Sequence, residues 1–142
     1  ILNKPGGLIG EEMEVVRQHP RLGHAIVMPL GLNPAVSSIV RLHHERYDGT
    51  GYPDGLKGEE IPLSVRVVAI CDAFDAMTSD RPYRRSMLKK DAFRLLKEAA
   101  GSQFDPRLVD QFMVMGREEG FDDMGRPMYR PGENHRFRVV GD

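Results

Sequence analysis

The sequence predicts an all-α fold, a bundle of about six helices. Three observations support this prediction. Apolar residues recur at helical spacing along much of the chain. Asn33-Pro34 and Asp105-Pro106 each pair a helix-capping residue with a proline, the combination that begins helices. The valine-rich segment after Pro62 has the composition of a strand, but it is long enough only for a helix.

Two helices and a break between them are predicted in the first third of the chain. Residues 10–18 carry three early glutamates, which favour a helix N-terminus because they face the positive end of the helix dipole. Pro20 either ends this helix or lies in the first turn of a new one. Asn33 as the cap and Pro34 as the first residue predict a further helix that runs to about Glu45.

A loop and a long helix are predicted for the middle of the chain. Residues 47–60 hold four glycines, one proline and two aspartates, a composition typical of a loop. A structured loop of this length more often carries function than serves only as a connector. From Pro62 to Asp80 the sequence is nearly continuously apolar, which predicts a central, buried helix.

Two more helices are predicted before the chain loses its periodicity. One runs from about residue 89 to residue 100 and is closed by Gly101 as its C-terminal cap. Asp105 and Pro106 repeat the pattern of a capping residue followed by proline and open a helix through about Glu119. We therefore expect a helical domain over residues 1–120 and an irregular C-terminal extension over residues 121–142.

Composition excludes several classes of protein. The chain has 142 residues, the size of one domain, with 20 basic and 21 acidic residues and a net charge of −1. A protein dedicated to DNA or RNA would be strongly basic, so nucleic acids are not expected partners. The single cysteine, Cys71, excludes an intramolecular disulfide. No apolar run approaches the ~20 residues of a membrane span, so we expect a cytoplasmic domain.

Histidines and aspartates in helical segments are the candidate metal ligands. His43 and His44 are adjacent, and both rings can reach one ion at the edge of a helix. Asp72 lies in the most apolar helix, with Asp75 three residues later; burial of a carboxylate there requires an ion pair or a metal. His19 precedes a proline. Each of these residues, taken alone, also fits an ordinary surface, capping or core position.

A basic segment follows the long helix. Residues 81–90 hold five basic residues and no acidic one, including Arg81 and Arg84 on either side of a Pro-Tyr pair. Arginine offers planar, bidentate donors to phosphate groups. A solvated basic surface is the alternative interpretation.

Two blocks of sequence resemble the HD-GYP family, bacterial metal-dependent phosphohydrolases that degrade cyclic di-GMP. The first block is HHERYDGTGYPDGLKGEEIPL, and the second is RVVAICDAFDAMTSDRPYR. The resemblance extends from Ile1 to Phe112. It implies an HD-domain-like helical bundle with two or three metal ions, commonly iron or manganese, with zinc or nickel as alternatives. The implied reaction hydrolyses cyclic di-GMP to pGpG or GMP in second-messenger signalling.

The resemblance also implies roles for individual residues. His19, His43, His44 and Asp72 match metal ligands of the family, and Asp72 is the one residue here that matches its catalytic carboxylates. Two further sets match the substrate-binding residues. These are the triplet Gly51, Tyr52 and Pro53 and the arginines Arg81 and Arg84.

The chain departs from the family pattern at one point. The family is named for an adjacent His-Asp pair that precedes the segment ILNKPG, and no adjacent His-Asp pair occurs in these 142 residues. The chain starts at Ile1 without a methionine, so we expect a fragment or processed chain. Without the aspartate that bridges two metals, we expect this chain alone to bind at most one ion and to be essentially inactive.

Alternatives remain open at the level of function. The chain fits a non-catalytic module that binds a cyclic dinucleotide or a protein partner, and it fits a phosphohydrolase for another cyclic dinucleotide. Missing helices upstream would expose apolar faces of the bundle and favour a homodimer. An upstream regulatory or receiver domain is a further expected partner.

Overall fold

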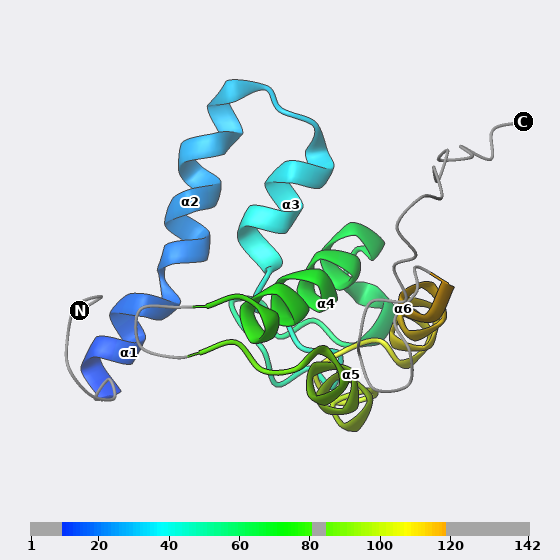
Figure 1. Ribbon diagram of the computed structural model, residues 1–142. Helices are drawn as coiled ribbons and strands as arrows, with labels where there is room; N and C mark the ends of the chain where they lie inside the picture. Colours follow the sequence, from blue (N-terminus) through cyan, green and yellow to red (C-terminus); the bar gives the residue numbers. More distant parts are fainter. Residues whose placement is uncertain (1–9, 81–84, 119–142) are drawn as a thin grey trace, which may run out of the picture.

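Every regular element in the described part of the chain is a helix. The computed structural model describes residues 10–80 and 85–118. Six α-helices lie within these ranges, so the predicted all-α fold of about six helices is confirmed (Figure 1). They are α1 (Gly10–Arg17), α2 (His19–Val27), α3 (Pro34–Leu42), α4 (Leu63–Thr78), α5 (Lys89–Glu98) and α6 (Pro106–Glu118). The predicted extension over residues 121–142 lies outside the described residues.

Helices α2 and α3 form a hairpin that projects from the other helices (Figure 1). Pro20 lies in the first turn of α2, so a new helix begins there, the second of the two outcomes predicted for this residue. A short 3₁₀ helix, Met28–Leu30, and Gly31 with a φ of 62° reverse the chain after α2. Asn33 caps α3 as predicted, because its side chain accepts a hydrogen bond from the Ala35 N–H at 2.9 Å.

Helix α3 ends at Leu42, three residues earlier than the sequence predicted. The N–H of Glu45 donates to the Leu42 carbonyl at 2.8 Å, which tightens the chain into a turn of three-residue spacing. The carbonyl of His44 then accepts from the Tyr52 N–H at 3.2 Å instead of continuing the helix. A contact with the following loop therefore replaces the last predicted turn of α3.

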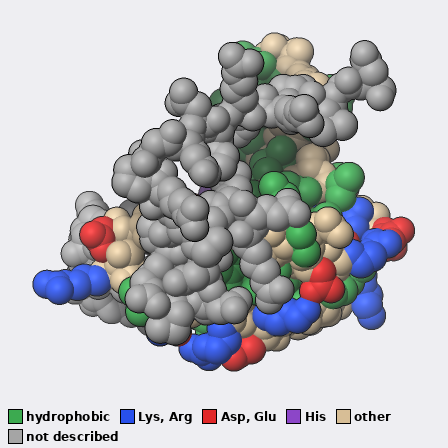
Figure 2. Space-filling view, turned by 45° about the vertical axis from the view of Figure 1, so that its right-hand side comes forward, with side chains coloured by type: hydrophobic (Ala, Val, Ile, Leu, Met, Phe, Trp, Pro, Cys, Tyr) green, Lys and Arg blue, Asp and Glu red, His purple; other side chains and the backbone are tan. Residues whose placement is uncertain are grey.

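Helix α4 joins two hydrophobic cores. Val65, near its start, packs with Leu42 and Ile61. Ile70, at its middle, packs with residues of α5 and α6 and the turn between them. The prediction of a central helix is confirmed, but the prediction that it is buried holds for one side only. Leu63 is 58% exposed and Val67 is 42% exposed, and hydrophobic side chains lie uncovered beside charges of both signs in Figure 2. No helix in the described ranges is both long and apolar enough to cross a membrane.

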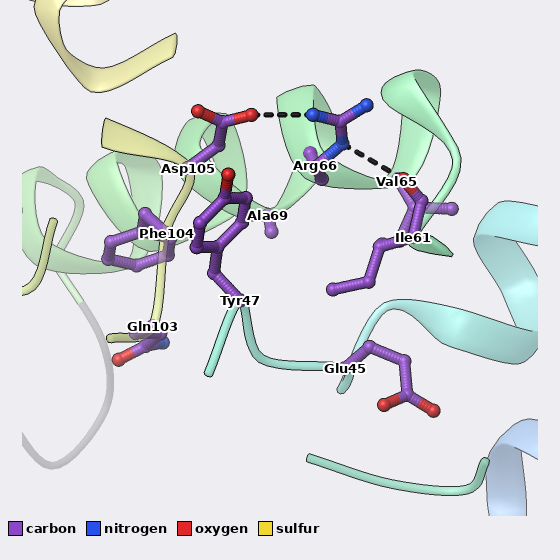
Figure 3. A pocket seen from close by; sticks show the side chains of 9 residues that line it. All are labelled: Glu45, Tyr47, Ile61, Val65, Arg66, Ala69, Gln103, Phe104 and Asp105. Carbon is purple, nitrogen blue, oxygen red and sulfur yellow. Dashed lines mark hydrogen bonds and ion pairs between the residues drawn. The ribbon is translucent and has the colours of Figure 1, made fainter. Parts of the chain in front are cut away.

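A buried ion pair fixes the start of α6 against α4. Asp105 is 1% exposed, and its carboxylate accepts hydrogen bonds from the Arg66 side chain and, at 2.9 Å, from the Arg107 N–H (Figure 3). Arg66 also donates to the Ile61 carbonyl at 2.9 Å. Burial alone would raise the pKa of Asp105, but the hydrogen bonds from Arg66 and Arg107 outweigh it and hold the pKa below its usual 3.8.

Asp105→Asn is expected to lower the free energy of unfolding by about 3 kcal/mol at pH 7, because it leaves the Arg66 side chain, which is only 11% exposed, without its counter-charge. Asparagine still caps α6, so the loss reports the ion pair. Because the pKa of Asp105 is lowered on folding, its contribution is complete above its unfolded pKa and is lost as the pH falls through the lower folded pKa. Urea unfolding at pH 7 and near pH 3 measures both effects.

Asp110→Asn is the control for this prediction. It removes an exposed ion pair with Lys97 and should lower the free energy of unfolding by less than ~1 kcal/mol. An equal loss of stability in both variants would refute the role given to the Asp105–Arg66 pair.

Candidate metal site

Three histidines meet at the base of the α2–α3 hairpin. His19 is the first residue of α2, and His43 and His44 directly follow α3. Because α2 and α3 pack against each other, residues 24 positions apart in the sequence become neighbours. His19 is exposed and the two others are half-buried, so the cluster opens to the surface.

The ring nitrogens of the three histidines converge. One nitrogen from each ring lies within 4.8 Å of the others, and the Nε2 atoms of His19 and His43 are 3.2 Å apart. The ring centroids are separated by 4.2 to 5.2 Å. The sequence predicted these three residues as metal ligands, and the structure brings them together.

Hydrogen bonds to the backbone orient two of the rings. The Nδ1 atom of His19 lies 2.6 Å from the Val16 carbonyl, and that of His43 lies 3.0 Å from the Val40 carbonyl. A carbonyl oxygen only accepts, so each Nδ1 carries the hydrogen and each neutral ring has its lone pair on Nε2. Metal-binding histidines typically donate their second ring N–H in this way.

These nitrogens fit a shared cation. Two lone pairs that face each other at 3.2 Å repel unless a proton or a cation lies between them. A tetrahedral ion with metal–nitrogen distances of about 2.0–2.1 Å separates two of its ligand atoms by roughly 3.3–3.4 Å. The spacing of His19 and His43 therefore matches ligands of one ion, and imidazole suits iron, zinc, nickel and related metals.

The third ring is kept neutral. Burial, followed by the neighbouring His43 and His19, lowers the pKa of His44 to about 4, while Asp72 acts in the opposite direction. His44 is therefore uncharged at neutral pH, the form in which imidazole binds metal. Tyr52 stacks on the His44 ring with centroids 4.7 Å apart and planes inclined by 27°.

The Gly51-Tyr52-Pro53 triplet lies directly against the histidines. Gly51 crosses the backbone after α3 so closely that a Cβ atom there would lie 2.4 to 2.6 Å from backbone atoms of residues 44–46. The Arg17 guanidinium lies 5.6 Å from the Tyr52 ring centroid, and the Pro53 carbonyl accepts a hydrogen bond from Arg21 at 3.0 Å. The loop thus contacts α1, α2 and the segment that follows α3.

Asp72, the other predicted metal ligand, is not part of this cluster in the described ranges. Asp72 is exposed on α4 and is not one of the grouped ligands, although its charge raises the pKa of His44. Because Asp72 is exposed, the burial cost expected for it does not arise. Arg81 and Arg84 lie outside the described residues.

One residue at the site had no predicted role. Glu45 is only 5% exposed, and its carboxylate binds the backbone of the loop. Its position beside the paired histidines was the available signal, but a glutamate at the predicted end of a helix looks like an ordinary surface residue.

The HD domain family matches residues 1–108. The chain belongs to this family. This HD domain carries the Gly-Tyr-Pro part of the HD-GYP signature at residues 51–53. It is 45% identical to the cyclic di-GMP phosphodiesterase response regulator RpfG of Xanthomonas campestris over 84% of this chain and 32% of the relative. It is 41% identical to a cyclic di-GMP phosphodiesterase of Thermotoga maritima, over 83% of this chain and 33% of the relative.

A solved structure shows the same fold. The crystal structure of a cyclic GMP-AMP-specific phosphodiesterase of Vibrio cholerae superposes with a TM-score of 0.62 at 23% identity, and it covers 78% of this chain and 26% of that chain. This HD domain chain spans about a third of the length of the curated relatives it matches.

Proposed function

We propose that this HD domain forms the metal-binding part of a phosphodiesterase that hydrolyses cyclic di-GMP to pGpG or GMP. The observation that carries the proposal is the convergence of three histidine nitrogens, with His19 and His43 oriented by their own backbone hydrogen bonds. The names of the curated relatives supply the substrate. Hydrolysis in the cytoplasm, and an upstream regulatory or receiver domain, belong to the same proposal.

Each predicted residue has a role in this proposal. His19, His43 and His44 hold one divalent ion, iron or manganese in preference to zinc or nickel. When bound, such an ion polarises a phosphoryl oxygen and lowers the pKa of water. Asp72, on the adjacent α4, is proposed as a further ligand and as the catalytic carboxylate. The substrate-binding residues are proposed to be Gly51, Tyr52, Pro53, Arg81 and Arg84.

The residues around the histidines offer suitable contacts for a dinucleotide. The ring of Tyr52 stacks on His44, and the guanidinium of Arg17 lies 5.6 Å from the Tyr52 ring centroid, so an aromatic ring and a cation lie beside the ligand cluster. Bases stack on aromatic rings and on arginine planes, and arginine pairs with phosphate. The near-neutral chain therefore carries local features for a small phosphodiester and not for a long nucleic acid.

Turnover by the gene-encoded protein that carries these residues tests the proposal. With Mn²⁺ and cyclic di-GMP, we expect pGpG or GMP to appear by chromatography, and cyclic GMP-AMP to be hydrolysed more slowly. Asp72→Asn is expected to reduce turnover at least 100-fold, whereas Asp75→Asn, one helical turn away, should retain it. Dinucleotide binding without any turnover would overturn the proposal and support the non-catalytic binding module.

A further inference from the structure

Glu45 is a buried anion that belongs to neither the predicted ligand set nor the predicted substrate contacts. One carboxylate oxygen accepts from the N–H groups of Asp54 at 2.7 Å and Gly55 at 3.1 Å. The other oxygen accepts from the Leu56 N–H at 3.0 Å. Hydrogen bonds to an ionised acceptor are among the stronger ones in proteins, so three consecutive amides on one carboxylate hold the backbone at 54–56 firmly.

The segment that Glu45 holds, residues 54–56, is separated from Tyr52 by Pro53 alone. In Figure 3 the Glu45 carboxylate points away from the Arg66–Asp105 pair, and its partners are in the loop. The Tyr52 N–H donates to the His44 carbonyl at 3.2 Å, and its ring stacks on the His44 ring. A continuous path of contacts therefore runs from Glu45 through the loop to the His44 ring.

His44 depends on this path more than the other two histidines do. The rings of His19 and His43 are oriented by their own Nδ1 hydrogen bonds to backbone carbonyls. For His44 the structure shows ring contacts with Tyr52 and the other two histidines. The Tyr52 ring, at 4.7 Å and 27°, is the flat contact that limits rotation of the His44 ring.

We propose that Glu45 is a positioning residue of the metal site, which folds residues 51–56 onto the histidines so that Tyr52 fixes the His44 ring toward the ion. This inference rests on the metal site of the proposed function. Glutamine at position 45 keeps the size of the side chain but has only one acceptor oxygen, so it loses at least one of the three amides. Its NH₂ group then faces a backbone N–H that has no acceptor.

Cobalt(II) binding to the full chain tests the inference. Glu45→Gln is expected to weaken Co²⁺ binding 10- to 100-fold, the usual effect of removing an outer partner of a ligand, and to change the visible Co²⁺ absorption. Glu60→Gln is the matched control, because Glu60 is exposed and its side chain accepts a single backbone N–H, from Lys57 at 2.9 Å. This control should bind Co²⁺ like the wild type.

A double-mutant cycle tests the path through Tyr52. Tyr52→Ala should weaken Co²⁺ binding to a similar extent, Tyr52→Phe should retain it, and the double variant with Glu45→Gln should lose no more than the larger single loss. Wild-type affinity in Glu45→Gln, or losses that add in the double variant, would overturn the inference. Absence of Co²⁺ binding by the wild-type chain would instead refute the proposed function, so the two failures are distinguishable. The Tyr52 variants leave Glu45 intact and decide the question even if Glu45→Gln does not fold.

Discussion

The His43→Ala variant is expected to lose more than ~100-fold in affinity for Mn²⁺ or Co²⁺, since removal of an outer partner alone costs about 10- to 100-fold. His43 supplies one of the two facing Nε2 atoms at 3.2 Å, so its removal opens the cluster at its closest contact. Isothermal titration of the wild-type and variant chains with metal measures this loss.

The stability of the same variant should depend on whether metal is present. The substitution removes one of two facing lone pairs, so the metal-free variant is expected to unfold at the wild-type temperature or above it. With metal at 100 times the dissociation constant, the wild type should gain about 2.7 kcal/mol and the variant almost nothing. His24→Ala, on α2 and outside the cluster, is the control and should gain as the wild type does. If metal stabilised His43→Ala as much as it stabilises the wild type, the proposed metal site would be contradicted.

The Gly51→Ala variant is expected to displace the loop and weaken metal binding at least 10-fold. An added Cβ would lie 2.4 Å from the Arg46 nitrogen and 2.6 Å from the His44 oxygen. These atoms belong to the backbone, so no side-chain rotation relieves the overlap. The loop must move outward, and Tyr52 then leaves the ring of His44.

Overpacking of this kind costs about 1–3 kcal/mol of stability. Thermal unfolding and a Co²⁺ titration of Gly51→Ala measure the two consequences. Gly10→Ala is a suitable control, because an added Cβ at Gly10 meets no atom within 4 Å. Wild-type affinity and stability in Gly51→Ala would show that the loop does not pack on residues 44–46 as described.

Most helix starts were predicted correctly from the sequence, because the start of a helix is determined by residues only a few positions away. Asn33 caps α3 through a hydrogen bond two residues away, and Asp105 caps α6 in the same way. The predicted end of α5 was two residues too late, because the helix stops at Glu98 with Ala99 as its C-cap. Gly101, predicted as the cap, lies in the turn that follows, where its φ of 82° favours glycine. The histidines were identified because their order along the chain matches a known family.

Contacts between distant residues account for what the sequence did not predict. Helix α3 ends early because the backbone of His44 pairs with Tyr52, eight residues away, and no local pattern records that contact. The apolar composition of α4 does not specify which of its sides is covered, and Leu63 and Val67 are exposed. Glu45 acts through amides nine to eleven residues later, which becomes visible only once the loop has folded back.

The proposed roles of Asp72, Arg81 and Arg84 concern turnover of the substrate, whereas those of the histidines are tested by metal binding. The structure groups three histidines as one set of ligand atoms and does not place Asp72 among them, so a single ion is expected, with Asp72 as its proposed further ligand. This agrees with the prediction of at most one metal per chain. A metal analysis of the purified chain that finds two or more tightly bound ions would contradict it.

X-ray diffraction from crystals of the Mn²⁺-loaded chain, recorded at the manganese absorption edge, tests the central claim most directly. The account predicts one anomalous peak per chain, bonded to Nε2 of His19, to Nε2 of His43 and to a ring nitrogen of His44. A peak that lies elsewhere, or an ion coordinated without these three histidines, would contradict it.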